Sequence, residues 1–149
     1  MQIVDFAFNY VVVFLIVLTI LVFVHEWGHY WVARRAGVRV EVFSIGFGPE
    51  IYGWTDKHDT RWKISAIPLG GYVKMFGEAD LGWEEEEESR PLSPEEKAVS
   101  FHHKKLWQRS AIVAAGPIAN FIFAAVLVAL LAGIVGTARP LAAVGEVQE

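Results

Sequence analysis

Two long apolar stretches flank a polar middle segment. The first covers residues 6–24, and only Asn9 and Thr19 interrupt it. The second covers residues 111–136 and contains no charged side chain. A helix of 19 residues is about 28 Å long, close to the thickness of the hydrocarbon layer of a bilayer. Each stretch is therefore expected to form a transmembrane helix, with Pro117 and Asn120 interrupting the second near its start.

The middle segment shows the pattern of short strands. Residues 38–45 alternate apolar and polar side chains, which is typical of a half-buried strand. Residues 62–67 and 72–75 are further strand candidates, and glycine- and proline-containing segments at 46–49 and 68–71 are expected to form turns. The fold class predicted is a membrane α-helical protein with a small β-hairpin or sheet between two transmembrane helices.

Capping signals divide the chain further. Gly37 suits the end of the first helix, and Ser93, Pro94 and Glu96 form the start of another with a capping box. The expected units are a first helix that extends past the membrane (1–36), a β loop with an acidic linker (37–92), an interfacial helix (93–110), the second transmembrane helix (111–136) and a short C-terminal piece (137–149).

Charge indicates the orientation in the membrane. Of the 13 lysine and arginine residues, 12 lie between Arg34 and Arg109. The positive-inside rule therefore places the loop 37–110 in the cytoplasm and both ends of the chain on the opposite side. A secretory signal peptide is the alternative for the first stretch, but no basic residue precedes it. The net charge of −4 argues against a nucleic-acid-binding function.

The candidate chemistry lies at the end of the first apolar stretch. His25, Glu26 and His29 form the pattern H-E-x-x-H. On a helix the two histidines project from one face, where both can bind one zinc ion, and the glutamate can accept a proton from a water molecule that zinc activates. The chain has no cysteine, so a thiolate site is excluded. The alternative is that these residues anchor the helix end, with structural hydrogen bonds to the histidines.

Four blocks of sequence together resemble the site-2 protease family of intramembrane zinc metalloproteases, and most of all its bacterial regulator of sigma-E branch. They are His-Glu-Trp-Gly-His at 25–29, Phe-Ser-Ile-Gly-Phe-Gly-Pro at 43–49, Ile-Pro-Leu-Gly-Gly-Tyr-Val-Lys-Met at 67–75 and Ala-Gly-Pro-Ile-Ala-Asn-Phe at 115–121. The blocks extend over nearly the whole chain in the order expected of the family.

The resemblance implies a protease of the bacterial inner membrane that cuts a transmembrane helix of its substrate, such as an anti-sigma factor or a signal-peptide remnant. It implies Zn²⁺ as cofactor, His25 and His29 as zinc ligands, and Glu26 as the catalytic base. By the same resemblance, an edge strand of the hairpin is expected to bind substrate, and a polar amide of the second membrane helix is expected to contact substrate or to orient the site. The residues at these positions are Gly71, Tyr72, Val73, Lys74, Met75 and Asn120.

One expected element has no counterpart in the sequence. The third zinc ligand of the family is an aspartate in a Leu-Asp-Gly motif on a later membrane helix, and no such motif follows residue 136. Residues 142–147 resemble the opening strand of a PDZ domain. The chain is therefore interpreted as the N-terminal portion of a longer enzyme, with little protease activity alone. A catalytically inactive membrane module that binds a substrate or partner is the alternative, and a metalloprotease with a glutamate ligand fits only the first block.

Overall fold

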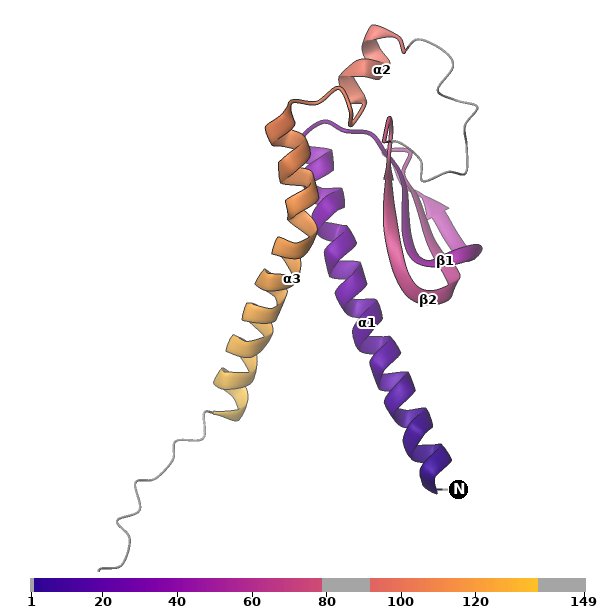
Figure 1. Cartoon of the computed structure of the whole chain (residues 1–149), viewed down its shortest axis with the longest axis vertical. Coiled ribbons are helices and arrows are strands. Elements are labelled where there is room, and N and C mark those ends of the chain that lie inside the picture. The colour runs from indigo at the N-terminus through magenta and orange to yellow at the C-terminus, as the bar shows by residue number, and fades with distance from the viewer. Residues whose placement is uncertain (1, 79–91, 137–149) are drawn as a thin grey trace, which may run out of the picture.

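The computed structural model describes residues 2–78 and 92–136, which form two long helices, one short helix and a two-stranded antiparallel sheet. In Figure 1, α1 lies between α3 and the sheet, and the two long helices pack together at one end and diverge toward the other. The elements in chain order are α1 (Gln2–Arg35), β1 (Val40–Thr55), β2 (Arg61–Met75), α2 (Pro94–Val99) and α3 (Leu106–Val135).

The two long helices are the membrane candidates. Phe8–Arg35 and Leu106–Ile134 are long and apolar enough to cross a bilayer. Helix α3 continues through Pro117 and Asn120, so these residues interrupt the apolar pattern but not the helix. Proline is tolerated inside membrane helices because neighbouring helices and local adjustments satisfy the backbone group that it frees. The fold class of a membrane helical protein with a small hairpin is confirmed.

Helix α1 ends as its sequence predicts. Gly37 adopts a φ of 73°, and the backbone N–H of Val38 donates to the carbonyl of Ala33 at 2.9 Å. The N–H of Gly37 donates to the carbonyl of Arg34 at 3.1 Å. These two bonds form a Schellman cap, which turns the chain sharply from the helix into the sheet.

The sheet contains two long strands where three short ones were expected. The predicted turns at 46–49 and 68–71 are continuous parts of β1 and β2. Gly46 and Gly48 have φ values of 87° and 84°, so β1 bends at these glycines without ending. As a result, Phe43 pairs with both Trp62 and Val73, at opposite ends of β2.

The link between the strands is fastened to α1 through Asp56. Its carboxylate accepts hydrogen bonds from the indole of Trp62 at 2.9 Å, the N–H groups of His58 and Thr60, and the hydroxyl of Tyr30 on α1 at 3.4 Å. Burial raises the pKa of Asp56, but the hydrogen bonds from Trp62, His58 and Thr60 outweigh burial and hold the pKa below its usual value. The sheet is therefore held against the same helix that carries H-E-x-x-H.

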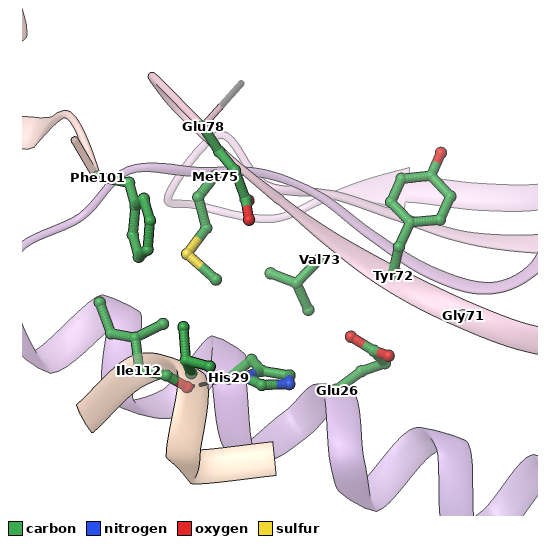
Figure 2. Close-up of a pocket in the computed structure, with 10 residues that line it drawn as sticks. Glu26, His29, Gly71, Tyr72, Val73, Met75, Glu78, Phe101 and Ile112 are labelled. Carbon is green, nitrogen blue, oxygen red and sulfur yellow. Dashed lines mark hydrogen bonds between the residues drawn. The ribbon is translucent and has the colours of Figure 1, made fainter. Parts of the chain in front are cut away.

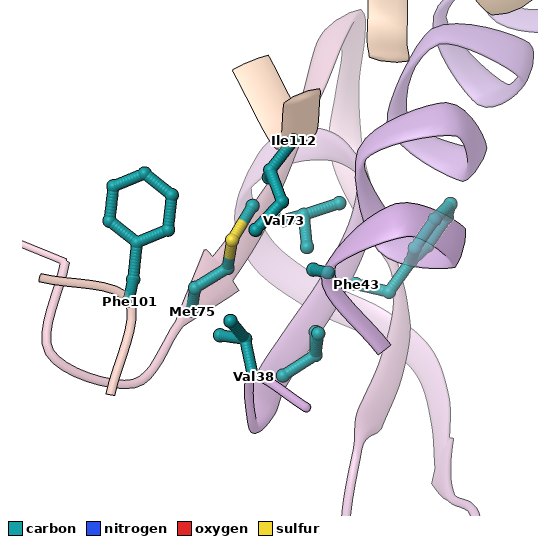
Figure 3. Packing of buried hydrophobic residues seen from close by; sticks show 8 residues of the cluster. Val38, Phe43, Val73, Met75, Phe101 and Ile112 are labelled. Carbon is teal, nitrogen blue, oxygen red and sulfur yellow. The ribbon is translucent and has the colours of Figure 1, made fainter. Parts of the chain in front are cut away.

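The apolar core lies where the sheet, α1 and α3 meet (Figure 3). Phe43 is 1% exposed, and its ring stacks on Trp62 with centroids 4.3 Å apart. Ile112 brings α3 into the same cluster and is fully buried. The buried members are Ala33, Val38, Val40, Phe43, Val73, Met75, Phe101 and Ile112.

The expected interfacial helix over 93–110 is two separate pieces. Its start is correct: Ser93 and Glu96 form the predicted capping box. However, α2 ends at Val99, and the N–H of Phe101 donates to the carbonyl of Phe76 at 2.8 Å. This hydrogen bond pairs residue 101 with the segment after β2 instead of with the preceding helical turn, so the helix does not continue past Val99. Helix α3 begins separately at Leu106. The acidic linker and residues 137–149 lie outside the described residues.

Candidate functional site

The H-E-x-x-H residues lie on the last turns of α1, beside the point where α1 crosses α3. His25 and His29 are one turn apart on the same face, with ring centroids separated by 4.8 Å and ring planes 77° apart. Both are half-buried. The predicted arrangement of two imidazoles on one helical face is therefore present in the structure.

Small residues bring α3 very close to these histidines. A Cβ atom added to Gly28 would lie 2.8 Å from the Cβ of Ala119 and would contact the carbonyl oxygen of Ala115. The backbones of the two helices consequently meet with no side chain between them at this level. This type of close crossing is typical of small residues in membrane helices.

Gly116 on α3 faces both imidazoles at once. A Cβ added there would contact Nε2 of His29 and would lie 2.7 Å from Nε2 of His25. The two Nε2 atoms therefore converge on one small space, which a single methyl group would fill. The sequence showed Gly116 only as part of a stretch rich in small residues, and its place opposite the histidines follows from the packing.

The remaining ring nitrogens of both histidines also contact α3. Nδ1 of His29 lies 2.8 Å from the carbonyl oxygen of Ile112, and Nδ1 of His25 lies 3.3 Å from Nδ2 of Asn120. The other amide atom of Asn120, Oδ1, is buried without a hydrogen-bond partner. Asn120, expected from the resemblance to contact substrate or to orient the site, thus lies against a candidate metal ligand. Ile112 was missed because it acts through its backbone.

Glu26 faces a cavity of about 320 Å³ between α1, β2 and α3 (Figure 2). A Cβ added to Gly71 would lie 3.3 Å from Cγ of Glu26, so strand and helix are in close contact here. Four of the five expected strand residues line this cavity, namely Gly71, Tyr72, Val73 and Met75, whereas Lys74 does not. His29 lines it too, and so does Glu78, which no sequence pattern indicated.

The donor set fits part of a zinc site. Imidazole nitrogens are common zinc ligands, and the space at Gly116 lies between two of them. Across residues 2–78 and 92–136, no group of three or more His, Cys, Asp or Glu side chains is arranged to hold a metal ion. The described residues therefore supply two of the ligands that a zinc site needs.

A model of the family named peptidase family M50 matches residues 13–148 of this chain. The chain belongs to peptidase family M50, the site-2 protease family. The resemblance stated from the four sequence blocks is thereby confirmed, and with it a membrane-associated protein of the metalloprotease class.

Several M50 relatives are similar over most of this chain. A protein of Agrobacterium fabrum named "Putative zinc metalloprotease" is 53% identical over 145 residues, which cover 97% of this chain and 38% of that protein. The "Regulator of sigma-E protease RseP" of Salmonella typhimurium is 52% identical over 111 residues, covering 74% of this chain and 23% of its own length. The chain thus spans well under half the length of these relatives.

Proposed function

We propose that this chain is the part of an intramembrane zinc metalloprotease that supplies two zinc ligands, the catalytic base and the surface that binds the substrate. The observation that supports this most directly is the convergence of both histidine Nε2 atoms beside Gly116, with Glu26 and His29 lining one cavity. The similarity to proteins named zinc metalloprotease agrees with this choice of metal.

Each residue has a defined task in peptide hydrolysis. His25 and His29 would hold zinc through Nε2. When bound, zinc polarises a carbonyl group and makes water a better nucleophile at neutral pH. Glu26 accepts the proton from the attacking water and delivers it to the leaving nitrogen, a task that its place on the cavity wall permits.

Substrate binding is proposed to occur by strand addition along β2. Tyr72 and Val73 pair with Ser44 and Phe43 of β1, and among the described residues no further strand pairs with the outer edge of this segment. An extended peptide bound there would lie beside the cavity that Glu26 lines. A transmembrane helix has all its amides bonded internally, so it must unwind before it can bind in this way.

The proposed setting is the inner membrane of a bacterium. The two apolar helices would span it, and the excess of basic residues between them supports a cytoplasmic position for the loop 37–110. The proposed substrates are transmembrane proteins of the anti-sigma factor or signal-peptide type. The relative named for regulating sigma-E supports the first of these classes.

Metal removal tests the reaction class. In the full-length protein, a zinc chelator is expected to reduce cleavage of a model transmembrane substrate to background, because two imidazoles alone do not activate water. Adding ZnCl₂ back should restore it. Cleavage that persists after zinc has been shown to be absent by elemental analysis would contradict the proposal.

Strand addition is tested by photo-crosslinking. A photoreactive phenylalanine analogue at Tyr72 is expected to crosslink to the substrate, because Tyr72 lies on the segment of β2 whose outer edge is proposed to bind the peptide. The same analogue at Tyr52 is the matched control, since Tyr52 lies on the far part of the sheet, paired with Ile64. Equal crosslinking from the two positions would argue against a defined peptide site on β2. Crosslinks at Tyr72 without any cleavage would favour a binding module.

A further inference from the structure

The histidines of α1 meet α3 at three positions that share one face of that helix. Ile112, Gly116 and Asn120 are spaced by four residues, so they lie one above another along α3. Ile112 contacts His29, Asn120 contacts His25, and Gly116 lies opposite both Nε2 atoms. One face of α3 therefore contacts every ring nitrogen of the two candidate ligands.

The contact with Ile112 fixes the tautomer of His29. A carbonyl oxygen can only accept a hydrogen bond, so Nδ1 of His29 must be the donor across the 2.8 Å separation. The neutral ring then carries its proton on Nδ1 and has its lone pair on Nε2. Zinc ligation through Nε2 requires this tautomer, and Nε2 of His29 lies opposite Gly116.

The contact with Asn120 differs in one important respect. As the amide lies, Nδ2 donates to Nδ1 of His25, which leaves the proton of the neutral ring on Nε2. Ligation through Nε2 requires the opposite tautomer, with Nδ1–H donating to an acceptor. The amide carries that acceptor itself, because its Oδ1 is buried without a hydrogen-bond partner. A half-turn of the terminal amide torsion exchanges Oδ1 and Nδ2.

We infer that Asn120 is a positioning residue for His25: in the zinc-loaded protein its Oδ1 accepts a hydrogen bond from Nδ1–H of His25, just as the Ile112 carbonyl does for His29. This inference rests on the proposed function. Of the two roles that the family resemblance left open for Asn120, it selects orientation of the site over contact with substrate, and it names His25 as the residue that Asn120 orients.

Three variants of the full-length protein test the inference through zinc affinity, measured by competition with a chromophoric chelator. Asn120→Leu removes the acceptor and is expected to weaken zinc binding about 10- to 100-fold, the usual effect of losing such a partner. Asn120→Asp keeps an oxygen that can accept from Nδ1–H of His25 and replaces the amide NH₂ donor with a second oxygen. This variant should bind zinc nearly as well as the wild type. Phe121→Leu changes the neighbouring side chain, which is 77% exposed, and should have no effect.

The tautomers give a second readout that does not depend on activity. Histidine ¹⁵N NMR of the zinc-loaded protein should show Nδ1–H on both rings in the wild type. In Asn120→Leu only His25 should change, and an unaltered His29 signal would show that the helices remain packed.

Two results would overturn the inference while leaving the proposed function intact. One is an Asn120→Leu variant with unchanged zinc affinity and a raised KM, which would assign Asn120 to the substrate. The other is an Asn120→Asp variant as impaired as Asn120→Leu. By contrast, if the His25→Ala and His29→Ala variants bound zinc as tightly as the wild type, the proposed function itself would be refuted.

Discussion

Replacing Glu26 by glutamine in the full-length protein is expected to reduce cleavage about 10²- to 10⁴-fold, the usual contribution of general acid–base catalysis. The amide has almost the same size and shape as the carboxylate but cannot accept a proton from water. Zinc content should stay at the wild-type level, because the ligand atoms are those of His25 and His29 on the adjacent helical face. Cleavage of a model transmembrane substrate and elemental analysis of the same preparation measure the two effects.

The matched control for this variant is Glu95→Gln. Glu95 is an exposed residue in the first turn of α2 and does not line the cavity, so the variant removes one negative charge without touching the site. Its cleavage rate should equal that of the wild type. If Glu26→Gln also retained full activity, Glu26 would not be the base, and the mechanism proposed for this chain would have to be abandoned.

The second large effect is expected from Gly116→Ala. The added methyl group would contact Nε2 of His29 and lie 2.7 Å from Nε2 of His25, so both imidazole rings would have to move out of their present positions. Zinc affinity should fall by more than about 100-fold, beyond the usual effect of losing an outer hydrogen-bond partner. Cleavage should be lost with it. Chelator competition and the cleavage assay measure both.

The matched control for Gly116→Ala is a second glycine-to-alanine substitution on α3. Gly133 has no other atom within 4 Å of an added Cβ, so Gly133→Ala introduces the same methyl group into open space on the same helix. This variant should bind zinc and cleave substrate like the wild type. Normal zinc affinity in Gly116→Ala would show that the two Nε2 atoms do not share a metal, because the methyl group displaces both imidazole rings from their present positions.

Local sequence signals predicted the parts of the fold that depend on neighbouring residues. The cap at Gly37 and the capping box of Ser93 and Glu96 were both correct, since each is complete within a few positions of the chain. The spacing of His25 and His29 likewise needs only the geometry of one helix. The strands were predicted less well, because Gly46 and Gly48 are compatible both with a turn and with a bend inside a continuous strand.

The contacts that build the site could not be derived from local patterns. Ile112 contacts a histidine 83 positions earlier in the chain, and does so through its backbone oxygen, which every residue type has. Asn120 was singled out as a polar residue in a membrane helix, but nothing in the sequence states which side chain it meets. Gly116 is important because it has no Cβ atom that would clash with the two imidazoles. All three depend on the register of α3 against α1.

That register has a mechanical consequence. The backbones touch where Gly28 meets Ala115, and the two histidine contacts with Ile112 and Asn120 lie on opposite sides of this point along the helices. The two helices are therefore connected by a hydrogen bond on each side of their crossing point. Widening the angle between the helices at this point would lengthen both hydrogen bonds. The same contacts that orient the imidazoles thus also hold the angle between the helices.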